Sequence, residues 1–249
     1  MARTQVAPRL EPRALPVDRA IALHAVVPAS LAGRRIGVDG RKAIVMRLGR
    51  LGLVTSSVDH EEFSPDAIGR ADEKWLRQQA RHQERVLERL RSEEGVWPAP
   101  FLTTYDGLEA LDAAAREHYI RWSRALTRVT GKVEFGVHAF VGPHALPDAE
   151  PYVLRVARRA AQGTPRLRAA VSPLDIHTRA LWDALRAIGS SARRFAAPGL
   201  RGFVLGATLL VDEGCNEAID GVLATLAPEG HALGLSVYVD GPRPPFSFS

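Results

Sequence analysis

The sequence predicts an α+β protein of two packed domains, of which the C-terminal one is ferredoxin-like and is followed by a C-terminal tail rich in proline and aromatic residues. The chain has 249 residues, 46% of them hydrophobic and 24% charged, which is the composition of a globular protein and the length of one to two domains. Segments with the period of strands alternate with segments of helical period. A glycine at position 131 follows a long helical run and separates two such series of elements.

Four parts are expected along the chain. Residues 1–16 form a flexible tail, 17–131 an N-terminal α+β domain, 132–239 the ferredoxin-like α+β domain and 240–249 a docking tail. The first sixteen residues hold three prolines and three arginines but no apolar core, which favours a loose tail over a secretory signal. Because no linker rich in glycine and serine joins the two domains, we expect them to pack closely.

The N-terminal domain is expected to begin with three strands. Short apolar runs predict strands at Ala20–Val27, Lys42–Leu48 and Leu51–Val58. The last two runs are separated only by Gly49-Arg50, which has the length of a hairpin loop. The sequence therefore predicts that these two strands are antiparallel neighbours.

Two helices follow. The first is predicted from Ser64-Pro65-Asp66 to about Ser92, because proline is favoured in a first helical turn and apolar residues then recur at helical spacing. The prolines of Gly95–Thr104 exclude a helix and a central strand. In the second helix, Asp106 and Glu109 have the spacing of a capping box, and Gly131 is a typical left-handed residue after a C-terminus.

The second half is predicted to run strand, helices, a weak short strand, strand, helix and strand, which is the βαββαβ order of a ferredoxin-like domain. The expected elements are, in order, Lys132–Val141, Pro151–Gln162, Ser172–Gly189, Arg193–Ala197, Phe203–Val211, Gly214–Leu226 and Ala232–Val239. The first strand alternates and is expected to be half-buried. Phe203–Val211 is apolar on both faces and should be central, and the helix after it should stop before Pro228.

Residues that carry chemistry are scattered, and no catalytic, metal or cofactor site is expected. The only cysteine, Cys215, excludes an internal disulfide and is expected to pack as a structural residue. The eight histidines include no His-Glu-x-x-His pair, and the densest group of potential ligands, Asp59–Glu62, lies in a loop. No phosphate-binding loop, dinucleotide fingerprint or Gly-x-Ser-x-Gly elbow is found. His82 lies beside the apolar stripe of its helix and is expected to be a hydrogen-bonded interface histidine.

The formal net charge of +5 is compatible with a nucleic-acid partner but does not require one. Only three of the 33 basic residues are lysine, and residues 202–249 carry one basic and six acidic side chains. A basic half could therefore bind an acidic C-terminal third, although a solvated surface is the favoured interpretation. An enzyme of unknown chemistry on a ferredoxin-like scaffold and a basic nucleic-acid-binding protein stay open as alternatives.

Three segments of the chain resemble the gas vesicle protein F/L family (GvpF/GvpL). The first is the helix His82–Glu88 leading into Val96–Thr103, similar to a family helix that runs into Val-Leu-Pro-Leu-Arg-Phe-Gly-Thr. The second is Gly131–Val137, similar to a Gly-x-x-Glu strand. The third is Gly241–Phe248, similar to the ending Gly-Pro-Trp-Pro-Pro-Tyr-Ser-Phe. The order and spacing hold over about residues 18–249, and the C-terminal segment is the most specific of the three.

The chain departs from the family pattern at four positions, as a divergent member would. Pro100 stands where the family usually has arginine, and Leu102 where it has glycine. Arg243 replaces tryptophan, and Phe246 replaces tyrosine.

The resemblance implies a minor gas vesicle protein, cytoplasmic and associated with the gas vesicle, that is no enzyme and has no cofactor. It implies a role in assembling the shell, with the small apolar shell protein and other assembly proteins as partners and neither nucleic acid nor membrane. An apolar subunit has to be covered until it polymerises. We expect strand addition to a sheet edge or docking of a helix into an apolar groove to provide that cover.

The C-terminal segment is expected to be ordered and to dock back onto the protein, with the rings of Phe246 and Phe248 on one side of an extended chain. A clamp is favoured over a ligand for the shell protein, because an attached tail has a high effective concentration. The candidates for partner contact or clamping are His82, Trp97, Pro98, Phe101, Pro242, Pro244, Pro245, Phe246 and Phe248.

Overall fold

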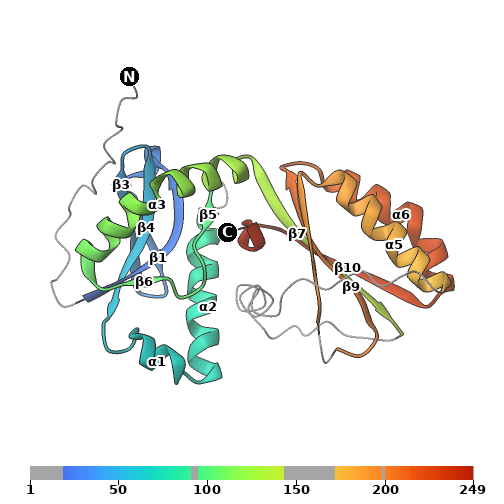
Figure 1. Ribbon diagram of the computed structural model, residues 1–249, viewed down its shortest axis with the longest axis horizontal. Coiled ribbons are helices and arrows are strands. Elements are labelled where there is room, and N and C mark those ends of the chain that lie inside the picture. Colours follow the sequence, from blue (N-terminus) through green and yellow to red (C-terminus); the bar gives the residue numbers. More distant parts are fainter. Residues whose placement is uncertain (1–18, 91–94, 143–171, 198–199, 249) are drawn as a thin grey trace. The chain divides into compact units, whose positions relative to one another are not determined.

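The computed structural model describes residues 19–90, 95–142, 172–197 and 200–248. The chain divides into two compact units, with the break between Thr130 and Gly131. Both units are mixed α/β structures, each built on one antiparallel sheet (Figure 1). In the described ranges no helix combines the length and the apolar character needed to cross a membrane. The helix predicted at Pro151–Gln162 lies outside the described residues.

Unit 1 contains a six-stranded sheet in the order β2-β3-β4-β1-β5, with β6 paired to β1 (Figure 1). The strands are β1 (Arg19–Pro28), β2 (Arg35–Val38), β3 (Arg41–Leu48), β4 (Leu51–Asp59), β5 (Trp97–Pro98) and β6 (Thr104–Tyr105), and a 3-10 turn, η1, covers Ala29–Leu31. The three strands predicted from apolar runs are confirmed, as is the hairpin that pairs Leu48 with Leu51. The two-residue β5 lies at the edge of the sheet, as the prolines around it require.

Strand β2 was not expected from the sequence. This strand joins β3 through Asp39-Gly40, where both residues have a positive φ, 53° and 74°. Asp-Gly is typical of the two-residue hairpin loop whose central residues both need a positive φ. The pattern that identifies the hairpin was therefore present in the sequence.

The single long helix predicted from Pro65 to about Ser92 is wrong, because the chain forms two helices there. These are α1 (Pro65–Gly69) and α2 (Glu73–Glu88). The side chain of Ser64 caps α1, and the carboxylate of Asp72 accepts a hydrogen bond from the backbone N–H of Trp75 at 2.7 Å. Asp72 therefore acts as an N-cap and starts a new helix where periodicity alone indicated continuity.

The third helix, α3 (Gly107–Val129), starts and ends close to the predicted positions, but the predicted capping box is wrong. The side chain of Asp106 makes no capping hydrogen bond and instead pairs with Nε2 of His60 at 3.0 Å. Gly131 has a φ of +69°, which confirms the left-handed residue expected after the helix. Both α2 and α3 pack against β1.

Unit 2 contains a four-stranded antiparallel sheet in the order β10-β7-β9-β8, with two helices along one face (Figure 1). Its elements are β7 (Lys132–Val141), α5 (Pro173–Ile188), β8 (Ser191–Phe195), β9 (Phe203–Asp212), α6 (Asn216–Ala232), β10 (Leu235–Arg243) and the 3-10 turn η2 (Phe246–Phe248). The prediction that Phe203–Val211 forms a central strand is confirmed, because β9 pairs with both β7 and β8. The apolar core lies between the sheet and the two helices.

Three expectations for unit 2 are wrong. β7 is not half-buried, because Glu134 and His138 on its second face are 0% and 3% exposed. α6 does not stop before Pro228 but continues to Ala232. Pro228 removes one N–H donor from the helix, but the close packing of the last turn against α5 outweighs that loss. β10 extends to Arg243 and so includes the first residues of the expected tail.

Gly206 of β9 is a position where a side chain cannot fit. A Cβ added there would overlap the rings of Phe195 and Phe203. We expect Gly206→Ala to lower the free energy of unfolding by about 1–3 kcal/mol, as overpacking does. Gly221→Ala on α6 is the matched control, because its Cβ would meet nothing within 4 Å and alanine favours a helix. Urea denaturation of both variants tests this, and equal stabilities would contradict it.

Candidate functional site

Unit 2 contains an apolar groove of about 200 Å³ between α5, α6 and β10, called the α5–α6 groove below. It is lined by His177, Leu181, Leu223, Ala224, Leu226, Ala227, Gly230, His231, Leu235 and Val237. Protein interiors contain few voids larger than a water molecule. An opening of this volume is large enough for an apolar side chain of a bound partner.

The groove exists because α6 is only shallowly buried. Only Ile219 and Gly230 of its seventeen residues are buried, whereas Leu223 and Leu226 are half-buried. Gly230 brings the last turn of α6 close to α5, since a Cβ there would lie 2.9 Å from Nε2 of His177. The two helices therefore meet at this end, and the apolar side chains nearer the middle of α6 line an opening.

The polar side chains that line the groove are two histidines, and acidic side chains lie elsewhere on α6. His177 is 3% exposed, and its Nδ1 lies 3.5 Å from a carboxylate oxygen of the exposed Glu229. α6 carries Glu217, Asp220 and Glu229 but no lysine or arginine. The arrangement has the character of a binding surface for an apolar segment, and the helix that forms one wall carries acidic side chains but no lysine or arginine.

The C-terminal turn η2, together with the two prolines before it, is bound to the sheet of unit 2, and Pro244–Phe248 is called the C-terminal latch below. Ser247 donates two hydrogen bonds to the carboxylate of Glu134, from its backbone N–H at 2.7 Å and from its hydroxyl at 2.6 Å. Arg193 of β8 donates to the carbonyl oxygen of Ser247, and its guanidinium lies 5.1 Å from the centroid of the Phe248 ring. Ser247 is thus bound by two charged groups, the carboxylate of Glu134 and the guanidinium of Arg193.

The C-terminal candidate residues differ in their burial. Pro244, Pro245, Phe246 and Phe248 are buried, whereas Pro242 is exposed. The expected extended conformation is wrong, because Phe246–Phe248 forms a 3-10 turn. Phe246 and Phe248 are nevertheless only 5% and 1% exposed.

The four candidates in unit 1 gather around α2 and β5. Trp97 and Pro98 are buried and pair with Val26 and Ala25 of β1. Phe101 is half-buried and lines a small cavity together with His82. The expected hydrogen bond of His82 is wrong, because both of its ring nitrogens are buried without a hydrogen-bond partner in the described part of the chain.

The turn after Pro98 explains why the family has glycine at the position of Leu102. The backbone N–H of Thr103 donates to the carbonyl oxygen of Pro100 at 3.2 Å, and Leu102 between them has a φ of +60°. A turn of this kind favours glycine at its third position. Leu102 therefore holds a backbone conformation in which a leucine is strained.

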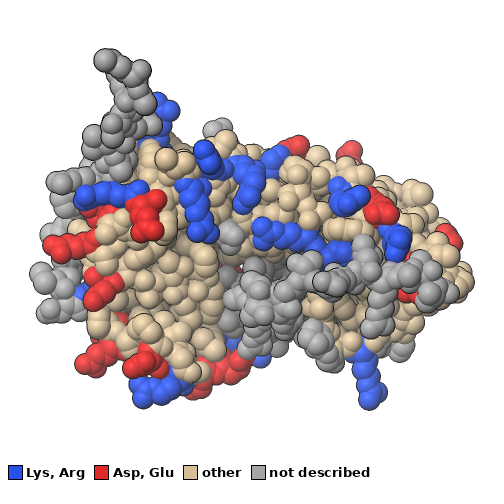
Figure 2. Space-filling view, viewed as in Figure 1, with Lys and Arg blue, Asp and Glu red and all other residues tan. Residues whose placement is uncertain are grey.

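Three further observations concern the alternative functions, an enzyme and a nucleic-acid-binding protein. No group of three or more metal-ligating side chains occurs within the described ranges. Cys215 is half-buried and packs against the core of unit 2. Figure 2 shows lysine and arginine side chains gathered over α3, where Arg121, Arg124 and Arg128 are exposed. Arginines along the outer face of one helix are typical of a solvated surface.

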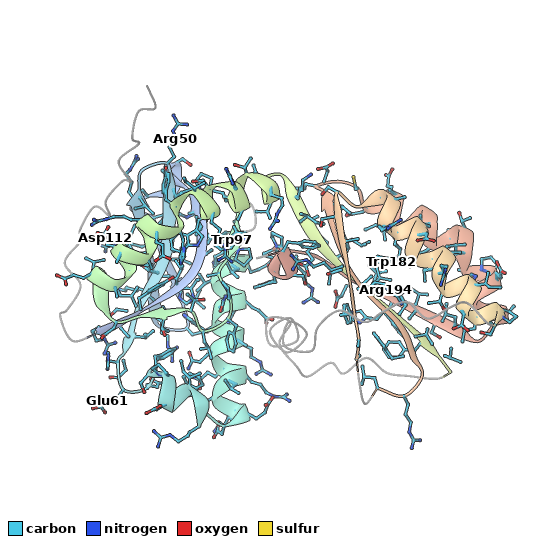
Figure 3. All side chains as sticks on the ribbon, viewed as in Figure 1. Arg50, Glu61, Trp97, Asp112, Trp182 and Arg194 are labelled. Carbon is cyan, nitrogen blue, oxygen red and sulfur yellow. The ribbon has the colours of Figure 1, made fainter. Side chains whose placement is uncertain are left out.

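Charged side chains also pack on aromatic rings inside unit 2. Figure 3 labels Arg194 of β8 and Trp182 of α5, and the guanidinium carbon lies 5.7 Å from the centroid of the Trp182 ring. Burial is the main cause that lowers the pKa of Arg194. This cation–π contact holds the edge strand β8 against α5.

The α5–α6 groove and the contact of Glu134 with the C-terminal latch were not predicted from the sequence. The groove depends on how two helices pack, which helical periodicity does not determine. Glu134 alternates with the apolar residues of β7 and was expected to face solvent. The one sequence signal for it was the Gly-x-x-Glu segment of the family pattern.

Comparison with known proteins identifies similar sequences and folds. The family model described as gas vesicle synthesis protein GvpL/GvpF matches residues 20–249. The crystal structure of the gas vesicle protein GvpF from Anabaena sp. PCC7120 is similar with a TM-score of 0.65 and 11% identity, covering 92% of this chain and 98% of that chain. That of GvpF from Microcystis aeruginosa has a TM-score of 0.63, 11% identity and the same coverage. No curated protein matches.

Proposed function

Because the chain belongs to the gas vesicle synthesis protein GvpL/GvpF family, we propose that it is a minor gas vesicle protein that assists assembly of the shell. In this role it binds the apolar shell protein and other assembly proteins, acts in the cytoplasm and at the gas vesicle, and catalyses no reaction. The domains proposed for it are 17–131 and 132–239, with a clamping tail after them. The sheet order β10-β7-β9-β8 and the order of elements support a ferredoxin-like second domain.

The observation that carries the proposal is the α5–α6 groove. Its lining is apolar except for two histidines, and its volume of about 200 Å³ is sufficient for a leucine or phenylalanine side chain. Covering such a side chain removes apolar surface from water, which contributes roughly 1.5–3 kcal/mol. The acidic side chains of α6 favour a segment in which lysine or arginine flanks the apolar residues.

Helix-in-groove docking is favoured over strand addition for this contact. Strand addition needs a free sheet edge with little charge. The edge strand β8 has five residues, of which two are Arg193 and Arg194. In unit 1 the edge strand β2 has four residues, and the edge strand β5 has two. These three edges are short or charged and are poor templates for another strand. The fourth edge strand, β10, is longer, but its last residues include Asp240, Pro242 and Arg243 and an irregular register, which also disfavour pairing.

Substitution in the groove tests the proposal. We expect Leu226→Asp to raise the dissociation constant for the shell protein about tenfold or more, because the carboxylate would have to be desolvated when an apolar segment binds. Thr225→Asp places the same charge on the adjacent, exposed position of α6 and is expected to bind normally. Binding is measured by pull-down, and protection of the shell protein from aggregation by light scattering.

Thermal denaturation of both variants separates a folding defect from a binding defect. A folded Leu226→Asp protein that still binds the shell protein and suppresses its aggregation would exclude the groove as the contact. If the unsubstituted chain neither binds the shell protein nor reduces its aggregation, the proposed function itself is wrong.

A further inference from the structure

Unit 1 contains a second cavity, with a group of polar side chains in its lining, that the proposed function does not use. Its volume is about 30 Å³, and it lies between the sheet and α2. His24 comes from β1, Arg41 from β3 and Ser56 from β4, whereas Gln79 and His82 lie three residues apart on α2. These five polar side chains from four elements line one small space, together with Gln83, Thr103 and six apolar residues.

Two hydrogen bonds fix the orientation of this lining. A ring nitrogen of His24, Nε2, lies 2.8 Å from the hydroxyl oxygen of Ser56. Arg41 donates from Nη1 to Oε1 of Gln79 at 2.8 Å, which determines which end of the Gln79 amide is the oxygen. The amide nitrogen of Gln79 is thereby left as a donor on the other side of the group.

Three buried nitrogens of the lining have no hydrogen-bond partner in the described residues. They are Nε2 of Gln79 and both ring nitrogens of His82. Gln79 is 5% exposed and His82 6% exposed, so bulk water does not satisfy them. Buried polar groups are nearly always hydrogen-bonded in folded proteins, and an exception indicates an internal water or ion.

The lining supplies donors and positive charge, from the amide nitrogen of Gln79, from the one N–H of a neutral His82 ring and from Arg41. The guanidinium of Arg41 is charged at any pH at which the protein is folded. The nearest carboxylate to the His82 ring belongs to Asp39, 4.0 Å from Nδ1, and Arg85 holds that carboxylate at 2.6 Å. Asp39 is therefore already neutralised by its own partner, and the charge of Arg41 is not balanced within the cavity.

We propose that this cavity binds one small monovalent anion of the size of chloride or bromide, held by Arg41, Gln79 and His82. The volume has room for one or two water-sized groups. Sulfate and phosphate are too large for it. The site is independent of the α5–α6 groove and of the proposed function.

The electrostatics of the two histidines agree with this site. Burial, then His82 and then Arg41 lower the pKa of His24 to about 3. Burial also lowers the pKa of His82, with Arg41 as the next cause. Both rings are therefore neutral at pH 7, and the anion is bound by Arg41 and by neutral N–H donors. A bound anion raises the pKa of both histidines.

Thermal denaturation of the full chain tests the proposal. The melting temperature is measured in sodium chloride, sodium bromide, sodium gluconate and sodium sulfate at one ionic strength and pH 7. We expect it to be several degrees higher in the two halides than in gluconate. Sulfate raises the melting temperature of folded proteins in general and therefore measures the non-specific salt effect, which Gln79→Leu should keep. Gln79→Leu should abolish the difference between the halides and gluconate. Thr178→Val, which removes another buried and unpartnered polar group on α5, should keep it.

Crystals of the unsubstituted chain grown in bromide provide a test that needs no variant. An anomalous bromide peak between Gln79 and His82 is expected. The proposal is overturned if the two halides and gluconate give one melting temperature, if Gln79→Leu keeps the halide effect, or if the cavity contains only water in the bromide crystals.

Discussion

Deleting Phe246–Ser249 is expected to lower the melting temperature of the protein by about 10–20 °C. Each of the two buried phenylalanine rings contributes roughly 1.5–3 kcal/mol. Each of the two hydrogen bonds from Ser247 to the Glu134 carboxylate contributes about 1.5–3 kcal/mol. Ordering the three residues Phe246–Phe248 costs about 1–2 kcal/mol each, so a net loss of about 4–5 kcal/mol remains at the middle of these ranges.

A double-mutant cycle with Glu134→Gln shows whether the hydrogen bonds carry this effect. In the full chain, Glu134→Gln weakens the two charge-assisted hydrogen bonds from Ser247 and should lower the free energy of unfolding by about 1–3 kcal/mol. In the truncated chain these hydrogen bonds are absent. The cost of the same substitution should then be smaller by about 1 kcal/mol or more.

The same truncation distinguishes a clamp from a ligand for the shell protein. A large fall in melting temperature with shell-protein binding kept in proportion to the folded fraction identifies a clamp. Unchanged stability with lost binding identifies a ligand. If neither stability nor binding changes, the C-terminal latch has neither role, and the contact of Ser247 with Glu134 contributes nothing measurable.

Local patterns in the sequence were sufficient to predict the positions of most strands and the end of the longest described helix, α3. Alternation and apolar runs gave β3, β4, β7 and β9 to within one residue. Gly131 marked the end of α3 because only glycine adopts a φ of +69° without strain. These features depend on residues close in sequence, which is why they can be predicted from one chain.

Features that depend on distant residues could not be predicted in this way. Glu134 and Ser247 are separated by 113 positions, and nothing near Glu134 indicates that its carboxylate is buried. Pro228 is normally a reason to end a helix, but packing of the last turn of α6 against α5 outweighs it. The α5–α6 groove likewise follows from how closely two helices approach at Gly230, which a periodicity of apolar residues does not encode.

Some features of the candidate residues depend on local sequence, and others depend on contacts between distant segments. The resemblance drew attention to Gly131–Val137 and Gly241–Phe248 as separate segments, and the structure joins them through the contact between Glu134 and Ser247. Leu102 shows the opposite case, since its φ of +60° could have been expected from the glycine that the family has there.

Acidification is expected to destabilise unit 1 through His24. The pKa of His24 is about 3 in the folded protein against 6.5 for an unperturbed histidine, and burial is the main cause. Between these two values the unfolded chain binds more protons than the folded one, so the free energy of unfolding falls as the pH falls. Each pH unit below 6.5 removes about 1.4 kcal/mol, which amounts to about 2 kcal/mol at pH 5.0 and about 5 kcal/mol near pH 3.

The groups that face His24 act in the same direction. Arg41 and the ring of His82, whose centroid lies 5.6 Å away, both oppose a positive charge on His24, and Ser56 bonds the neutral ring. His24→Gln removes the titration but keeps an amide that can bond the Ser56 hydroxyl, so its unfolding free energy should change much less between pH 7.0 and pH 5.0. His118→Gln, at a half-buried position on α3, should keep the dependence of the unsubstituted chain. Urea denaturation at the two pH values decides the matter, because an equal loss in the unsubstituted chain and in His24→Gln would show that His24 is not the group responsible.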